Sequence, residues 1–178
     1  MSLGNGRSSL GSLPYVWCIY LLVLGCESVE TQRDRFFTQG NEAIESKSYE
    51  RAINLYTKAI KIDSDDAESI NNRGVAKREL GRIYEAIQDY NEALLINDEF
   101  WDCLHNRAMA YQEAGDWSKS IRDYDLLIAH QDTSIYHQAK ALIFTDSKDY
   151  DRAIAEFNQV LERNPEDTEA KINLATLD

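Results

Sequence analysis

Histidine is the side chain of this sequence best suited to general base catalysis at neutral pH. A hydrolase would place such a base beside a nucleophile, commonly on a glycine-rich turn. The chain has three histidines, His105, His130 and His137, all in segments with helical periodicity and none beside a glycine-rich turn. These residues predict no catalytic set, and we expect that the chain is not an enzyme.

Pairs of carboxylates are a second arrangement that can do acid–base chemistry. Each pair here falls where a helix is expected to begin, and a carboxylate at that place caps free backbone amides and offsets the helix dipole. No sequence motif for a phosphate loop, a dinucleotide site or a calcium loop is present, so no cofactor and no metal is expected. Capping is therefore the predicted role of the acidic pairs, which are Asp65-Asp66, Asp149-Asp151 and Glu166-Asp167.

The three cysteines do not have the spacing of a zinc or redox site. Cys18, Cys26 and Cys103 form no Cys-x-x-Cys pair and have no histidine at the distance that a structural zinc site uses. Cys18 and Cys26 lie in the apolar N-terminal stretch. Cys103 is left without a partner for a disulfide and is predicted to be a small apolar side chain on a helix.

The charge of the chain restricts its partners. Its 178 residues carry a formal net charge of −12, from 31 acidic and 19 basic side chains. A field of this sign repels a phosphate backbone, so no nucleic acid partner is expected. The length fits one folded unit, and the small number of Gly and Pro residues, eight and two, favours a helical protein.

The N-terminal segment has the layout of a signal peptide. Residues 8–26 carry no charge, and residues 13–25 are almost all apolar, with Arg7 as the single basic residue before them. A membrane-spanning helix needs about 20 apolar residues. This run has 13 and contains Pro14, so export is favoured over a permanent membrane span.

The end of this segment, Val-Leu-Gly-Cys at residues 23–26, resembles the lipobox of bacterial lipoproteins. In that family a small residue precedes a cysteine that accepts a diacylglyceryl group and becomes the mature N-terminus. The resemblance implies that Cys26 is the lipidation site and that residues 1–25 are a signal peptide that is removed. Residues 26–32 are then a short linker after the lipidated cysteine.

The lipoprotein resemblance also implies a location in the bacterial cell envelope. Glu27 follows the cysteine, where lipoproteins retained at the inner membrane typically carry Asp, which favours the outer membrane and a protein that faces the periplasm. Two alternatives remain open. The segment is otherwise a secretory signal peptide that is cleaved without lipidation, or an uncleaved signal anchor.

From about residue 33 the sequence repeats with a period of 34 residues, shortened to 33 between the third and fourth units. Apolar residues recur three and four positions apart in each unit, which predicts two short amphipathic helices per unit. The repeating positions are Gly40, Gly74, Ala108 and Ala141 for one small residue, Ala52, Ala86, Ser120 and Ala153 for another, and Tyr56, Tyr90, Tyr124 and Phe157 for an aromatic residue.

These columns resemble the tetratricopeptide repeat. The resemblance implies an all-α fold, a right-handed superhelical solenoid of antiparallel helix hairpins, in which small residues let two helices approach and the aromatic residue fills the space between them. The repeats it implies are residues 33–66, 67–100, 101–133 and 134–167, with 168–178 as a partial, capping helix.

In this family the first helix of each hairpin lines a concave surface that holds another polypeptide. The positions that face this surface here combine amides with apolar groups, which suits an extended peptide or a docked helix. We therefore expect a peptide-binding groove formed by Phe37, Asn41, Asn71, Asn72, Val75, Arg78, His105, Met109, Gln112, Gln138 and Leu142.

One subclass of the family clamps a C-terminal carboxylate with cations and asparagines. Asn41 and Asn72 match that pattern, but Phe37, Asp102 and Asn106 stand where it requires cations. A carboxylate clamp is therefore excluded. The two asparagines are interpreted as groups that bind a peptide backbone or as ordinary polar residues of the groove.

The function predicted from these features is that of an adaptor or scaffold that binds a protein or peptide partner and is tethered to the envelope by its lipid. One alternative is a structural assembly subunit, resembling pilotins, of a secretion or pilus machine. Another is a cytosolic scaffold held by a signal anchor.

Overall fold

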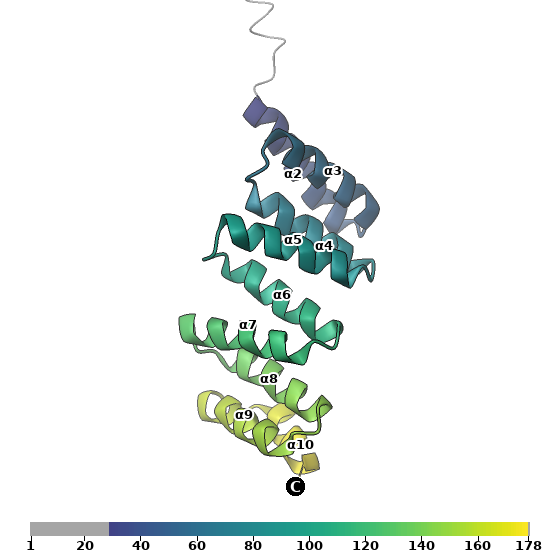
Figure 1. Ribbon diagram of the computed structural model, residues 1–178. Helices are drawn as coiled ribbons and strands as arrows, with labels where there is room; N and C mark the ends of the chain where they lie inside the picture. Colours follow the sequence, from purple (N-terminus) through teal and green to yellow (C-terminus); the bar gives the residue numbers. More distant parts are fainter. Residues whose placement is uncertain (1–28, 178) are drawn as a thin grey trace, which may run out of the picture.

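The computed structural model describes residues 29–177. This part of the chain forms nine helices and no strands, and the helices are stacked one after another along a single axis (Figure 1). The predicted all-α fold is confirmed. The helices are α2 (Val29–Glu45), α3 (Tyr49–Ile62), α4 (Ala67–Glu79), α5 (Ile83–Ile96), α6 (Trp101–Glu113), α7 (Trp117–His130), α8 (Ser134–Asp146), α9 (Tyr150–Arg163) and α10 (Thr168–Leu177).

Successive helices pair as hairpins, each made of an A helix followed by a B helix. The A helices are α2, α4, α6 and α8, and the B helices are α3, α5, α7 and α9. Each helix packs on the next one along the chain, and α10 packs on α9 as the next A helix would. The structure therefore has the predicted superhelical arrangement of four hairpins and a capping helix.

The turn between the two helices of a hairpin requires one residue in the left-handed backbone region. That residue is Gly81 in the second hairpin and Gly115 in the third, both with φ of 75°. The equivalent residues of the first and fourth hairpins are Lys47, with φ of 54°, and Lys148, with φ of 60°. Because a Cβ atom makes this backbone region unfavourable, the two lysine turns are strained where the two glycine turns are not.

The small and aromatic columns pack against each other inside the hairpins. A Cβ atom added to Gly40 would lie 2.5 Å from Tyr56 Cε1, and one added to Gly74 would lie 2.7 Å from Tyr90 Cε1. Both tyrosine side chains are buried. The missing side chain of each glycine is therefore what lets the A helix rest on the aromatic ring of the B helix.

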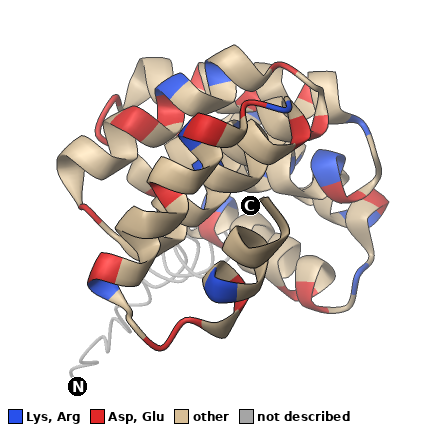
Figure 2. Cartoon of the chain, turned by 90° about the horizontal axis from the view of Figure 1, so that it is seen from below, with Lys and Arg blue, Asp and Glu red and all other residues tan. Residues whose placement is uncertain are grey.

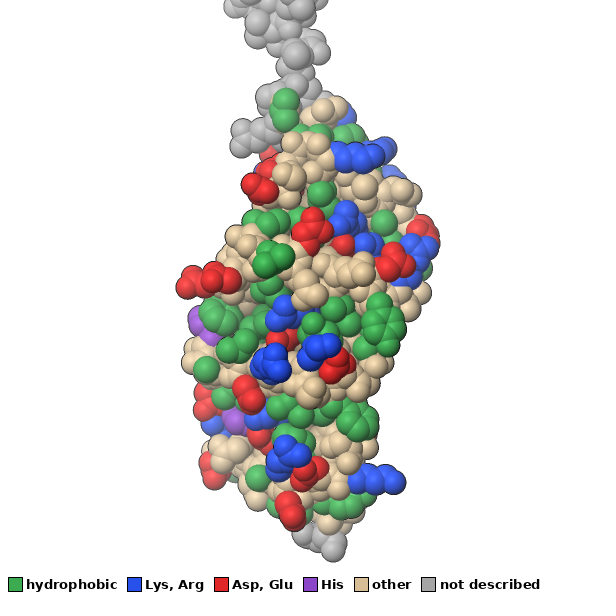
Figure 3. All heavy atoms as spheres, in the orientation of Figure 1, with side chains coloured by type: hydrophobic (Ala, Val, Ile, Leu, Met, Phe, Trp, Pro, Cys, Tyr) green, Lys and Arg blue, Asp and Glu red, His purple; other side chains and the backbone are tan. Residues whose placement is uncertain are grey.

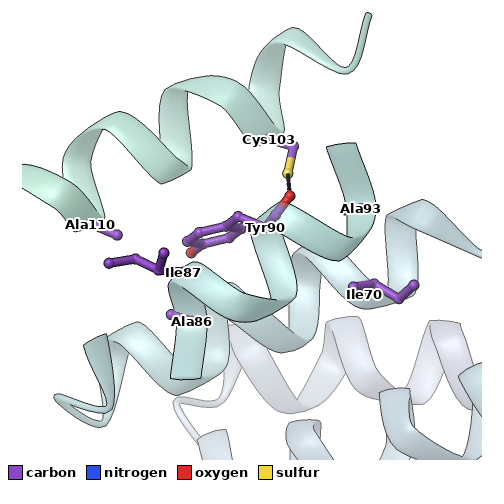
Figure 4. Packing of buried hydrophobic residues seen from close by; sticks show 7 residues of the cluster. All are labelled: Ile70, Ala86, Ile87, Tyr90, Ala93, Cys103 and Ala110. Carbon is purple, nitrogen blue, oxygen red and sulfur yellow. Dashed lines mark hydrogen bonds between the residues drawn. The ribbon is translucent and has the colours of Figure 1, made fainter. Parts of the chain in front are cut away.

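The apolar core continues between hairpins. One cluster of buried residues around Tyr90 joins α4, α5 and α6 (Figure 4). Cys103 belongs to this cluster, and its Sγ donates a 3.5 Å hydrogen bond to the carbonyl oxygen of Tyr90. Burial raises the pKa of the Cys103 thiol to about 12. Cys103 is thus the buried apolar residue that its sequence context predicted.

Acidic residues cap helices as predicted. Asp66 Oδ1 accepts a hydrogen bond from the backbone N–H of Ser69 at 3.0 Å, at the start of α4. Asp149 accepts one from the backbone of Arg152 at 3.3 Å, at the start of α9, and Asp167 accepts one from Ala170 at 2.9 Å, at the start of α10. Each of the three acidic pairs therefore supplies a cap.

A column of ion pairs also repeats along the stack. Arg73 lies 2.8 Å from Asp89 and Arg107 lies 2.8 Å from Asp123, each joining the A and B helices of one hairpin. In the fourth hairpin Lys140 lies 2.6 Å from Glu156. The first hairpin has Gln39 and Leu55 at these positions, so the cation and the anion are replaced together.

The predicted signal peptide and the lipidation site Cys26 lie outside the described residues. Helix α2 begins at Val29, so helical structure extends into residues 26–32, which we expected to be a linker. Residues 29–32 contain no Gly or Pro that would stop a helix from starting there. Between residues 29 and 177, no helix is long and apolar enough to cross a membrane.

Candidate functional site

The A helices lie on the inner side of the stack. Helix α2 contacts α4 and α4 contacts α6, whereas the B helices of neighbouring hairpins make fewer contacts with each other. A stack of helices curves towards the side on which they approach most closely. The predicted groove residues all lie on these A helices.

A row of four asparagines, of which Asn71 is buried, joins one A helix to the next. Asn72 on α4 donates to Asn41 Oδ1 on α2 at 3.3 Å, and Asn71 donates to Asn72 Oδ1 at 3.0 Å. Asn106 on α6 donates to Asn71 Oδ1 at 3.0 Å. The row brings together the three predicted groove asparagines and extends them with Asn106.

The side chain of Asn41 is held in place by the core. The hydroxyl of Tyr56 donates to Asn41 Oδ1 at 2.7 Å, and burial raises the pKa of Tyr56 to about 12. Within residues 29–177, Asn41 Nδ2 has no hydrogen-bond acceptor. A fixed amide with free N–H groups is suited to bind a carbonyl oxygen from outside the chain.

A pocket of about 300 Å³ opens beside the asparagine row. Phe37 is not part of its lining, but its ring packs against that of the lining residue Tyr56, with the centroids 6.1 Å apart. Apolar walls with an amide rim suit an apolar side chain whose own backbone reaches the amides. The pocket is lined by Asn41, Ile44, Glu45, Tyr56, Asn72 and Val75.

Farther along the groove, Arg78 connects α4 to α6. Its Nη1 lies 3.7 Å from Met109 Sδ and its Nε lies 3.7 Å from Glu113 Oε1. Glu79 is a second carboxylate neighbour, 3.4 Å from Nη2. Because two carboxylates surround the cation, this part of the groove is not a site for an anionic ligand. Gln112, half-buried on α6, precedes Glu113.

His105 lies in an aromatic cluster on the same face. Its ring centroid is 6.1 Å from that of Tyr124 and 5.6 Å from that of Tyr136, which meets it edge to face. Burial and the positive charge of Arg78 lower the pKa of His105, and Asp102 opposes this only in part. The imidazole is therefore neutral at pH 7. Tyr136 also packs against the buried cluster that contains Tyr124.

The last two predicted residues, Gln138 and Leu142, lie on α8 and are half-buried. Leu142 packs against the core of the fourth hairpin. The asparagine row does not reach them, because Ala139 stands where Asn72 and Asn106 stand in the two preceding repeats. The concave face thus has a polar half on α2, α4 and α6 and a more apolar end on α8.

Comparison with protein families agrees with this geometry. A profile described as TPR repeat matches residues 40–77. Profiles described as tetratricopeptide repeat match residues 67–100, 105–168 and 139–177. The repeats of this chain are tetratricopeptide repeats.

Solved structures of other tetratricopeptide-repeat proteins superpose on most of the chain. MamA from Desulfovibrio magneticus, residues 41 to the end, has a TM-score of 0.78 at 11% identity, over 84% of this chain and 85% of that one. A tetratricopeptide-repeat protein from Parabacteroides merdae has a TM-score of 0.75 at 21% identity, over 82% of this chain and 59% of that one. YrrB, described as a TPR protein with an unusual peptide-binding site, has a TM-score of 0.69 at 17% identity, over 80% of this chain and 74% of that one. At these identities the similarity establishes the fold.

Charged groups of the repeats are spread over the helices and turns. Acidic and basic residues both occur all around the stack when it is viewed along its axis (Figure 2). Among residues 29–177, no three His, Cys, Asp or Glu side chains gather in a group that could hold a metal ion. What the concave face offers is hydrogen bonds and apolar contacts.

Proposed function

We propose that this tetratricopeptide-repeat protein is a non-catalytic adaptor that binds a peptide or helix of a partner protein along its concave face. The observation that carries the proposal is the row of asparagines that joins α2, α4 and α6. A polypeptide backbone alternates donors and acceptors, and an asparagine side chain can satisfy either. The members of the row that are not buried, Asn41, Asn72 and Asn106, therefore suit a bound main chain of varied sequence.

The pocket beside Asn41 adds selectivity to this proposal. Its walls include Ile44 and Val75, which suit an apolar side chain of the partner. Burying one such side chain contributes about 1.5–3 kcal/mol. The partner is thus expected to be a segment with one apolar anchor in a polar context.

The proposed adaptor is tethered to the bacterial envelope by a lipid on Cys26, facing the periplasm, with the outer membrane favoured. The support is the lipobox resemblance at residues 23–26. A permanent, pilotin-like assembly subunit is the alternative, and it would be recovered in fixed stoichiometry with its machine.

The groove is tested by crosslinking in the native envelope followed by purification of the chain and its adducts. Asn41→Ala combined with Asn72→Ala removes the row on two helices, and Asn158→Ala, an exposed residue of the B helix α9, is the matched control. We expect about a tenfold loss of the adduct for the first variant, since each lost hydrogen bond contributes about 1 kcal/mol. Equal recovery of the crosslinked adduct from both variants would refute the proposal that the partner binds in the concave groove.

The tether is tested separately by mass spectrometry of the N-terminus of the envelope-bound protein. An acylated Cys26 as the first residue is expected. An intact Met1, or an unmodified residue farther along, would refute the lipid anchor and leave the groove proposal standing.

A further inference from the structure

A second recess lies on the outer side of the stack, between the B helices α5 and α7. Its volume is about 680 Å³, and helix α6 forms its floor. In the space-filling view, which faces the B helices, hydrophobic side chains lie in the region between α5 and α7 (Figure 3). The apolar lining comes from Leu94, Leu95, Trp101, Leu104 and Leu126.

Two of these residues break the pattern of the repeats. Leu95 is 88% exposed and Leu126 is 50% exposed, and they face the recess from α5 and α7. The residue equivalent to Leu95 in the first repeat is Lys61. The residue equivalent to Leu126 in the second repeat is Glu92. Across all four repeats, the position of Leu95 holds Lys61, Ala129 and Glu162, and that of Leu126 holds Lys58, Glu92 and Gln159, so a large apolar residue occurs at each position only at this recess.

The neighbouring gaps between B helices are bridged by charged side chains. Arg82, at the start of α5, lies 2.6 Å from Glu50 on α3. Lys140 on α8 lies 2.8 Å from Asp125 on α7 and 2.6 Å from Glu156 on α9. Between α5 and α7, Arg107 on α6 forms a similar bridge, to Asp123 on α7 and, at 2.9 Å, to Asn91 on α5. The recess opens above this bridge, and most of its lining is apolar.

One end of the recess is rigid and electronegative. Trp101 stacks on His130 with ring centroids 3.8 Å apart and an angle of 11° between the planes. Asp98 lines this end and Glu99 follows it in the chain. The C-termini of α5 and α7 lie at the same end; α5 has no basic residue in its last turn, and the basic residue in the last turn of α7 is His130.

We propose that this recess is a docking site for an amphipathic helix of a partner protein that carries basic residues at one end. The lining of the recess begins at Asn91 on α5 and ends at Asp98, so it offers about 10 Å, which is two turns of a docked helix. Leucine-like side chains three and four residues apart would enter the recess between Leu95 and Leu126, and lysine or arginine would lie beside Asp98 and Glu99.

Charge decides which occupant fits. A second copy of this chain would bring another net charge of −12 to the interface, and the two copies would repel. A basic helix is attracted by the same field. This outer site is separate from the concave groove, so one adaptor could hold two partners at once.

The test is a selection of phage-displayed amphipathic helices of 18 residues on the full chain in detergent. We expect selected helices with apolar residues at i, i+3, i+4 and i+7 and with lysine or arginine clustered at one end. Leu95→Lys combined with Leu126→Glu restores the residues of other repeats without changing the net charge. It should weaken these helices by about tenfold or more, because two apolar contacts are lost.

The matched control is Gln88→Lys combined with Asn158→Glu, which makes the same charge change at exposed positions of α5 and α9. This variant, and Asn41→Ala with Asn72→Ala in the concave groove, should bind the selected helices as the native chain does. The proposal is overturned if no helix is selected, if the leucine variant binds equally well, or if sedimentation shows a dimer that the leucine variant abolishes.

Discussion

The hydroxyl of Tyr56 donates a 2.7 Å hydrogen bond to Asn41 Oδ1 and so connects the core of the first repeat to the asparagine row of the groove. One repeat later, Val75 stands at the position of Asn41. The buried hydroxyl of Tyr90 consequently has no hydrogen-bond partner in the described part of the chain. The same packing position is thus satisfied in one repeat and unsatisfied in the next.

This difference predicts opposite results for one substitution. Tyr56→Phe breaks a hydrogen bond and should lower the free energy of unfolding by about 0.5–1.5 kcal/mol. Tyr90→Phe removes a buried hydroxyl without a partner and should leave stability unchanged or raise it. Urea denaturation followed by circular dichroism measures both. Equal losses for the two variants would contradict the assignment.

The ion pairs between A and B helices predict a rescue. Arg107→Gln leaves Asp123 buried without its cation and should cost about 3 kcal/mol of stability. Adding Asp123→Leu copies the Gln39 and Leu55 of the first hairpin and should restore most of the loss. Denaturation of the single and double variants decides this. If the double variant is less stable than Arg107→Gln, removal of the unpaired Asp123 charge does not restore stability, and the prediction is wrong.

The strained turns predict that glycine stabilises the first hairpin. Lys47→Gly relieves a left-handed backbone at φ of 54° and should raise the free energy of unfolding by about 0.5–1 kcal/mol. The reverse exchange at the equivalent turn, Gly81→Lys, should lower it by a similar amount. Thermal unfolding of the two variants tests both predictions. Midpoint temperatures that shift in the same direction would contradict the proposed backbone strain at Lys47.

Buried tyrosines predict a loss of stability in alkali. Burial raises the pKa of Tyr56 and of Tyr124 to about 12, above the value of 10.0 for a free tyrosine. Between these pH values the unfolded chain releases the phenol protons and the folded chain retains them, so stability falls as the pH rises. Tyr124→Phe should reduce the slope of unfolding free energy against pH in this window. Tyr84→Phe, at a residue that is 73% exposed, should not.

The recurring small and aromatic positions predicted the fold because the residues at these positions contact each other in every hairpin. A small residue at Gly40 and an aromatic residue at Tyr56 touch across the hairpin, and their spacing in sequence reports that contact directly. The helix caps could also be predicted from the sequence, since Asp66 accepts a hydrogen bond from an amide only three residues away. The ion pairs were missed although Arg73 and Arg107 recur with the same period, because only the apolar columns were compared.

The groove was predicted less completely than the fold. Its residues were proposed from the family register and stay a prediction, whereas the hydrogen bond between Asn71 and Asn106 depends on the distance between neighbouring A helices. The outer recess was missed because a single exposed Leu is unremarkable in a helix. Only the comparison of Leu126 with Glu92, together with the spacing of α5 and α7, makes it a site.

The central claim, that the concave face holds another polypeptide, is tested most directly by a photo-crosslinking amino acid placed at Val75 in the native envelope. Asn158, exposed on α9, is the control position. We predict a discrete polypeptide adduct from position 75 that is lost when Asn41→Ala and Asn72→Ala are introduced, and no adduct of that size from position 158. A position 75 that crosslinks only to lipid or to nothing, while the protein is folded and envelope-bound, would contradict the claim.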